Sequence, residues 1–241
     1  MFSAITPTLT GPLVGSAIAG QKTNIHERLT ITNTSDATVT ETITPALFLS
    51  TGTTIDSSAI ALPNAPAKAI TLKPGKHVTI PIVLKTTPLD VPAGTYHLLA
   101  QVTDPNRQSA QAASDRTMTI VAPQIDLTGS FITLPKNPVQ GQATTFLVKV
   151  VNNGNVPAVG QFQVLLGVST TQSLGAGTPI ISTQNLQGNI KPHHSIKVRV
   201  NSTPDATGTF FLVCQVDPGD VFHDVNRDNN TFFSTTTITV R

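Results

Sequence analysis

The chain has 241 residues, of which 39% are hydrophobic, 12% charged and 5% aromatic, with a net charge of +2. This balance excludes a disordered chain, because apolar residues are abundant and net charge is small. Before Pro123 there are eight basic and seven acidic residues, and from Pro123 on there are seven and six. Each half is therefore nearly neutral and lacks the positive charge that binds nucleic acid. No polybasic segment and no apolar run of about 18 residues occurs, so no membrane insertion is expected.

The two ends of the chain suggest that it is a piece of a longer protein. Residues 1–10 hold no charged segment and no continuous apolar run, so they do not predict a signal peptide. The chain stops inside a strand-like run at 235–241. We therefore expect an excised piece of a longer exported protein, whose Met1 is added or fortuitous.

The first half of the sequence alternates short strand patterns with turns. Alternating apolar residues predict strands near 28–32, 47–51, 78–82 and 94–104. Turns are predicted at 33–36 and 73–75, where Asn, Asp, Pro and Gly gather. The stretch Val-Ala-Pro at 121–123 then predicts a short, stiff boundary between domains 1–122 and 123–241, arranged end to end.

The second half repeats this organisation. Strands are predicted near 125–133, 146–151, 162–168, 196–200, 210–216 and 232–240, with a short one near 179–182. Period-two alternation recurs and a helical period does not. About seven short strands with turn signals between them predict an immunoglobulin-like Greek-key β-sandwich.

The two halves also share residues in the same order, which predicts a duplication. The spacing between matched residues is 119, then 118, then 114, at Asn33/Asn152, Lys73/Lys191 and Gly94/Gly208. A slow drift of this kind is what small loop insertions and deletions produce. We therefore predict an all-β protein made of two tandem immunoglobulin-like sandwiches.

The second half resembles the CARDB family, the cell-adhesion-related domain found in bacteria. The residues that carry the resemblance are 123–127, the turn 152–155, 168–170, Lys191-Pro192, 208–210 and the ending 217–230. In that ending Asp224, Asn226, Asn229 and Asn230 match the family's spacing, whereas Arg227 stands where a Glu is common. The first half matches loosely, as a divergent relative. The resemblance implies a repeated immunoglobulin-like module of large secreted or surface proteins, acting as spacer, adhesion unit or accessory.

The acidic turn near the end of the chain supports two hypotheses. The first hypothesis is a Ca²⁺ site, because side-chain oxygens are the hard ligands that Ca²⁺ prefers. Its candidate ligands are Asp217, Asp220, Asp224, Asn226 and Asp228. The segment 224–228 has the first three ligand positions of a calcium loop, but position six is Asn229 instead of Gly. The second hypothesis is a structural turn, because Asn and Asp side chains bond nearby backbone; Asn226, Asn229 and Asn230 are its predicted members.

Catalysis has little support in the sequence. Glu27 and Glu41 are the only glutamates, both fall in the first half, and no Gly-x-Ser-x-Gly, His-Glu-x-x-His or phosphate-binding loop occurs. The lone Cys214 shares a strand face with apolar residues and is predicted to be a buried thiol. His193 and His194 are predicted in a solvent-facing turn. We expect no enzyme and no cofactor, with Ca²⁺ as the open alternative.

Binding of a partner is the remaining class of function. The chain has no Trp, its one tyrosine, Tyr96, is predicted to lie in a core, and Phe211, Phe222 and Phe233 are the aromatic residues open to question. An uncharged sandwich edge could instead accept a partner strand. We expect a non-catalytic structural or adhesion module whose partners are other domains of the same polypeptide. The alternative is an accessory module, stabilised by Ca²⁺, that binds a glycan or a surface protein.

Overall fold

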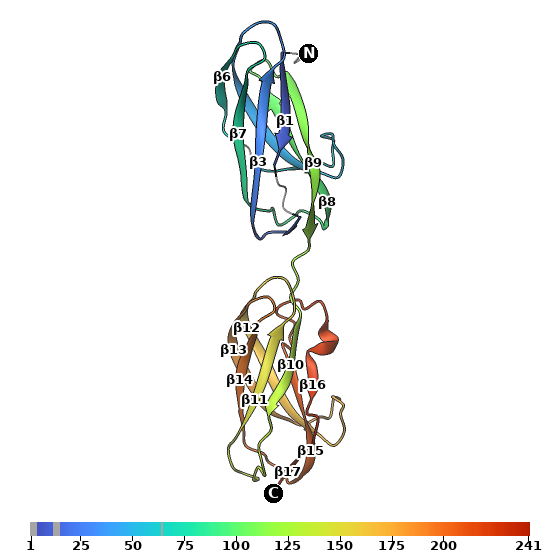
Figure 1. Ribbon diagram of the computed structural model, residues 1–241. Helices are drawn as coiled ribbons and strands as arrows, with labels where there is room; N and C mark the ends of the chain where they lie inside the picture. The colour runs from blue at the N-terminus through green and yellow to red at the C-terminus, as the bar shows by residue number, and fades with distance from the viewer. Residues whose placement is uncertain (1–3, 12–14, 64) are drawn as a thin grey trace. The chain divides into compact units, whose positions relative to one another are not determined.

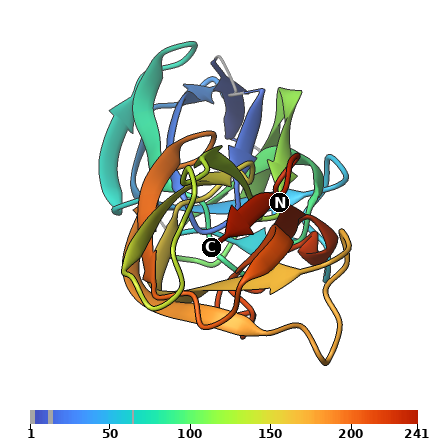
Figure 2. The same ribbon diagram turned by 90° about the horizontal axis from the view of Figure 1, so that it is seen from below.

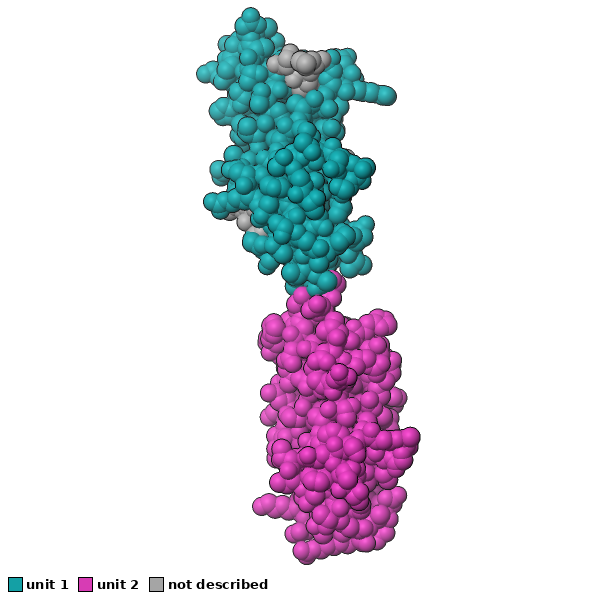
Figure 3. Space-filling view, turned by 90° about the vertical axis from the view of Figure 1, so that its right-hand side faces the viewer, with its two compact units in different colours: residues 1–122 teal, residues 123–241 magenta. Residues whose placement is uncertain are grey.

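The computed structural model describes residues 4–11, 15–63 and 65–241, which are built mainly of β-strands (Figure 1). The first three residues of segment 1–10 lie outside the described residues. The chain divides into two compact units, Met1–Ala122 and Pro123–Arg241, coloured separately in Figure 3. Each unit packs two sheets around its own apolar core, so the predicted all-β fold of immunoglobulin-like sandwiches is confirmed.

The described residues of the first unit form nine strands. They are β1 (Ile5–Thr10), β2 (Ser16–Ile18), β3 (Lys22–Asn33), β4 (Val39–Ser50), β5 (Ile60–Ala61), β6 (Lys68–Leu72), β7 (His77–Thr86), β8 (Gly94–Thr103) and β9 (Ser109–Val121). One sheet has the order β1-β3-β7. The other has the order β2-β9-β8-β4-β5, and β6 also pairs with β4. Alternation places Ile25, Leu29 and Ile31 of β3 in the core between the sheets.

The second unit repeats the two-sheet arrangement (Figure 1 and Figure 2). Its elements are β10 (Leu127–Thr133), β11 (Thr144–Asn152), β12 (Ala158–Ser169), β13 (Ile180–Ile190), β14 (Ser195–Ser202), β15 (Gly208–Val216), the 3₁₀ helix η1 (Arg227–Asn229), β16 (Thr231–Phe233) and β17 (Ile238–Val240). The sheets have the orders β10-β11-β14 and β13-β12-β15-β16, and β17 also pairs with β15. The predicted inward residues Phe146, Val148 and Val150 are fully buried.

Two strands differ from the sequence prediction. The short strand predicted near 179–182 is the start of β13, which runs on to Ile190 and pairs with β12 along most of its length. Its Ser, Thr, Asn and Gln side chains hide the alternation that marks a strand. The single strand predicted at 232–240 is broken into β16 and β17, because the Ser234 hydroxyl turns inward and accepts the Leu212 N–H at 2.9 Å.

A fully buried asparagine fixes the same turn in both units. Asn33 donates through Nδ2 to the carbonyls of Ala37 and Leu72, both at 2.8 Å. Asn152 donates to the carbonyls of Val156 at 2.8 Å and Ile190 at 2.9 Å. Each amide therefore ties the turn that follows its own strand to a neighbouring strand end. We call these two residues the clamp asparagines.

The backbone around each clamp asparagine is bonded in the same way as well. The carbonyl of Asn33 accepts the Gly75 N–H at 2.9 Å, and the carbonyl of Asn152 accepts the His193 N–H at 2.7 Å. Gly75 and His193 both have positive φ, 71° and 59°. A left-handed residue is thus required at this point of the turn, which glycine adopts more easily than histidine.

Candidate functional site

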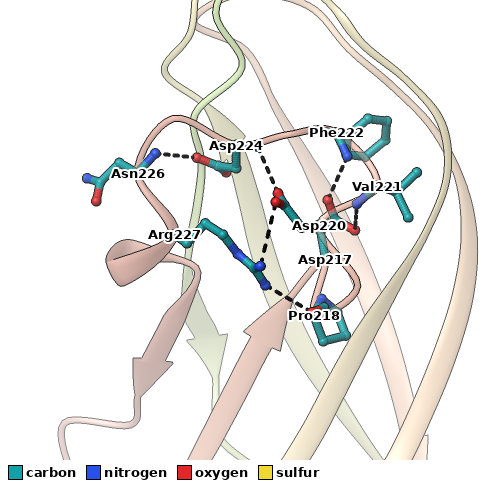
Figure 4. A network of polar contacts seen from close by, with 8 residues as sticks. All are labelled: Asp217, Pro218, Asp220, Val221, Phe222, Asp224, Asn226 and Arg227. Atoms are coloured by element: carbon teal, nitrogen blue, oxygen red, sulfur yellow. Dashed lines mark hydrogen bonds and ion pairs between the residues drawn. The ribbon is translucent and has the colours of Figure 1, made fainter.

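The acidic turn of the sequence forms a loop that joins β15 to β16. We call residues 217–230 the acidic loop; it leaves β15 after Val216, passes through η1 and enters β16 at Thr231. Figure 4 shows its polar contacts. Three of its residues, Asp217, Asp220 and His223, have positive φ between 47° and 53°. Aspartate is one of the few residues that adopts this conformation readily, which explains part of the loop's composition.

Asp217 anchors the start of the loop. Its side chain is fully buried, and its two carboxylate oxygens accept the N–H groups of Val221 at 3.1 Å and Phe222 at 3.0 Å. Its own N–H donates to the carbonyl of Gln163 on β12 at 2.8 Å. The carboxylate therefore closes a tight turn of its own backbone and holds Phe222 toward the core, where that ring lies 5.6 Å from Phe162.

Asp220 holds the middle of the loop. One carboxylate oxygen accepts the Asp224 N–H at 2.9 Å, and the other lies 3.6 Å from Nη1 of Arg227. Nη2 of Arg227 donates to the Pro218 carbonyl at 2.9 Å, so the guanidinium ties the two arms of the loop together. Both side chains of the ion pair are partly exposed, and the pair contributes little to stability by itself.

Asp224 connects the loop to the beginning of the unit. One of its oxygens accepts the Asn226 N–H at 2.8 Å, and the other accepts the Leu127 N–H of β10 at 2.6 Å. The Val225 N–H donates to the carbonyl of Ile125 at 3.0 Å. The side chain is buried, so these charge-assisted hydrogen bonds are shielded from water. Asp224 thus fixes the first strand of the second unit from a position 97 residues later in the sequence.

The remaining predicted residues of the loop lie in different surroundings. Asn226 and Asp228 are exposed. Asn229 donates from Nδ2 to Asp126 Oδ1 at 2.8 Å, while its Oδ1 is buried without a partner. Asn230 is buried, and neither polar atom of its side chain has a hydrogen-bond partner in the structure. The local backbone bonds that the sequence assigned to these asparagines are made by Asp217, Asp220 and Asp224.

The geometry of the loop bears on the calcium hypothesis. Over residues 4–11, 15–63 and 65–241, no three His, Cys, Asp or Glu side chains form a group that could hold a metal ion. Asp217 and Asp224 direct their oxygens at backbone N–H groups, and Asp228 and Asn226 lie at the surface. These contacts to backbone N–H groups are of the kind that a structural turn uses.

The cysteine and the aromatic residues that the sequence analysis considered are buried or half-buried. Cys214 is buried, and burial raises the pKa of its thiol to about 12, which leaves it unreactive at neutral pH. Tyr96 is buried with its hydroxyl on the Pro92 carbonyl at 2.9 Å. Phe222 is buried and Phe211 and Phe233 are half-buried, and no aromatic side chain of the described residues is fully exposed.

One buried acid was not recognised from the sequence as unusual. Glu27 lies on β3 between Ile25 and Leu29 and is only 2% exposed. Among the described residues, neither of its carboxylate oxygens has a hydrogen-bond partner. Burial raises its pKa, the charge of Asp115 raises it further, and Arg116 acts in the opposite direction. The alternation of β3 was the signal that could have placed it in the core, because residues 25, 27, 29 and 31 share one face.

Comparison with known proteins places the second unit in a family. The CARDB family model matches residues 124–234, which include every strand from β10 to β16 and the whole acidic loop. No curated protein matches the sequence. In the part of the chain that the structure describes, we find no helix with the length and hydrophobicity needed to cross a membrane.

Several solved structures resemble one unit of the chain. The CARDB domain of a Pyrococcus furiosus protein, solved in solution, is 18% identical over 49% of this chain and 96% of that chain, with a TM-score of 0.37. A crystal structure of the same domain, in complex with di-metal ions, is 17% identical over 49% and 89%, with a TM-score of 0.35. A domain of a candidate cell surface protein from Methanosarcina acetivorans is 22% identical over 50% and 94%, with a TM-score of 0.36.

At these identities and scores the likeness does not transfer binding properties to this chain. The family match is the finding that identifies the domain, and it ends just after the loop whose Asp and Asn spacing carried the resemblance. Residues 124–234, which make up most of the second unit, form a domain of the CARDB family.

Proposed function

We propose that the chain is a non-catalytic structural and adhesion module, a spacer or presenting element of a larger secreted or cell-surface protein. CARDB is a non-catalytic domain family that is associated with cell surfaces. The observation that carries the proposal is the use of the acidic loop. Its Asp217, Asp220 and Asp224 carboxylates accept backbone N–H groups, so they hold the sandwich together instead of facing a substrate.

The surface location can be tested in the cells that make the protein. An antibody raised against the chain should label intact cells, and brief protease treatment of intact cells should remove the label while a cytoplasmic marker survives. Labelling that appears only after the cells are lysed would contradict the proposal. The cytoplasmic marker is the control, because its loss would reveal leaking cells.

We also infer that the two units arose by duplication of one sandwich. Support comes from the clamp asparagines Asn33 and Asn152, which make the same pair of carbonyl contacts and lie before equivalent left-handed turns. A second parallel is the serine that accepts a buried N–H: Ser114 accepts that of Leu98, and Ser234 that of Leu212.

The structural role of the acidic loop makes a prediction about Ca²⁺. Millimolar Ca²⁺, compared with excess chelator, should leave the melting temperature of the second unit unchanged, because a ligand that does not bind the folded state cannot stabilise it. Asp224→Asn should lower that melting temperature equally with and without Ca²⁺, since it weakens the contact to Leu127. Differential scanning calorimetry measures both.

The exposed Asp228 supplies the matched control for this experiment. Its side chain is at the surface, so Asp228→Asn should leave the melting temperature unchanged in every condition. A rise in melting temperature with Ca²⁺ that disappears in Asp228→Asn would establish a cation site in the loop and refute its purely structural role.

A further inference from the structure

The strand β13 is a long open edge of the second unit. It is the terminal strand of its sheet and pairs only with β12. Its first residues are tied to β14 by side chains: Ser202 Oγ donates to the Ile181 carbonyl and Ser182 Oγ to the Asn201 carbonyl, both at 2.8 Å. Within the described chain, the backbone groups of residues 183–189 form hydrogen bonds to β12 and to no other strand. We call residues 183–189 the open edge.

The open edge lacks the features that keep sheet edges apart. Natural edges are protected by charged residues, by proline, by shortness or by a covering segment. Residues 183–189 contain no charge and no proline. Their exposed side chains are Thr183, Asn185, Gln187 and Asn189, and the next strand presents Gln161 and Gln163 on the same face. Gln163 Nε2 of β12 donates a hydrogen bond of 3.0 Å to Asn185 Oδ1 of β13, which links the amide side chains of the two strands.

Most other outer strands of the described chain carry at least one of these protections. The outer strand β7 carries Lys85, and the outer strand β14 carries Lys197 and Arg199. The outer strand β1 contains Pro7. The outer side of β10 is covered by the acidic loop and β16, because Thr128 Oγ1 bonds the Asn229 carbonyl and Phe131 packs on Phe232. The strands β2, β5, β16 and β17 are three residues or shorter.

The first unit offers an internal comparison, because the strand beside β4 is broken there. β5 pairs with β4 at Phe48 and Leu49, β6 pairs with it from Val39 to Ile43, and the chain between them contains Pro63 and Pro66. β6 also begins with a lysine. In the described part of the first unit, the strand beside β4 therefore does not form a continuous, uncharged edge like that of β13.

We propose that the open edge of one molecule pairs with the open edge of a second copy of this chain, antiparallel and around a twofold axis. The two five-stranded sheets would then continue into one another through backbone hydrogen bonds. The inference is independent of the surface location proposed above.

Charge is the argument for a second copy as the partner. In an antiparallel twofold pairing the edge meets the same edge running in reverse, so charged side chains near the axis would lie close to those of the second copy. Like charges facing each other across strands are unfavourable. The open edge meets this condition because its exposed side chains are Thr, Asn and Gln, whose hydroxyl and amide groups can donate to and accept from one another.

The pairing of a single edge buries little surface, so we expect a weak and reversible dimer. Sedimentation equilibrium from about 10 μM to about 1 mM should show a shift from monomer toward dimer. Asn185→Lys with Gln187→Lys should weaken the association at least about tenfold, because lysines then oppose lysines across the axis. Both residues are exposed, so the fold should be unaffected.

The matched control places the same two charges on an interior strand of the other unit. Thr42→Lys with Thr44→Lys, at exposed positions of β4, should associate as the unchanged chain does. Hydrogen exchange should slow with rising protein concentration within residues 183–189. A chain that stays monomeric up to about 1 mM, a dimer that the edge lysines do not weaken, or protection confined to other strands would each overturn the proposal.

Discussion

Asn152→Ala should lower the melting temperature of the second unit by roughly 10–20 °C and leave that of the first unit unchanged. The substitution removes the donor to two buried carbonyls, those of Val156 and Ile190, and the acceptor of the Gly154 N–H. Each buried polar group left without a partner costs about 1–3 kcal/mol, so together they remove a large part of the stability of a domain. Calorimetry, with one transition expected for each unit, measures the shift.

The other clamp asparagine provides the reciprocal experiment. Asn33→Ala should lower the first transition and spare the second, because its amide bonds only Ala37, Leu72 and Ser35 of its own unit. Asn153→Ala, an exposed neighbour, is the control and should shift neither transition. If either clamp variant moved both transitions together, the two units would not unfold independently.

Glu27→Gln should raise the melting temperature of the first unit at neutral pH by roughly 5 °C, because a charged carboxylate no longer has to be buried. In the folded state the pKa of Glu27 is raised above its ordinary value of 4.5 by burial and then by Asp115, against the effect of Arg116. Because the folded pKa lies above the unfolded pKa, folding at a higher pH must either bind a proton at Glu27 or bury its charge. Either process lowers the free energy of unfolding.

The sign of the pH dependence follows from that shift. Below pH 4.5, Glu27 is protonated in both folded and unfolded states, so it imposes no pH-dependent penalty there. As pH rises toward the higher folded pKa, the penalty grows, and above the folded pKa it is complete. The gap in melting temperature between Glu27→Gln and the unchanged chain should therefore widen as pH rises above 4.5 and stop widening above the raised folded pKa. Asp36→Asn, at an exposed position, is the control; an equal gap at all pH values would refute the account.

The sequence was sufficient where a local pattern decides the structure. Phe146, Val148 and Val150 alternate and are buried, and the match of Asn33 with Asn152 marked two equivalent turns before their contacts were known. β13 was missed beyond its first residues because an edge strand needs few apolar side chains, so polar residues such as Asn185 and Gln187 are tolerated there.

The candidate site depended on contacts that no local pattern contains. The acidic loop looked like a set of ligands because Asp224, Asn226 and Asp228 have calcium-loop spacing. The decisive partner of Asp224 is the Leu127 N–H, at the other end of the unit. The same spacing of Asp and Asn residues suits a carboxylate that accepts a backbone N–H and a carboxylate that binds a cation. Only the folded structure distinguishes the two roles.

The break between β5 and β6 sets a limit on how many molecules can associate. A molecule with an open edge on both of its units could join two neighbours and extend into a fibre. Because Pro63 and Pro66 interrupt the corresponding strand of the first unit, that strand offers no second open edge of this kind, and twofold pairing uses the open edge of β13 completely. Association through β13 therefore closes at two molecules and cannot propagate into a filament.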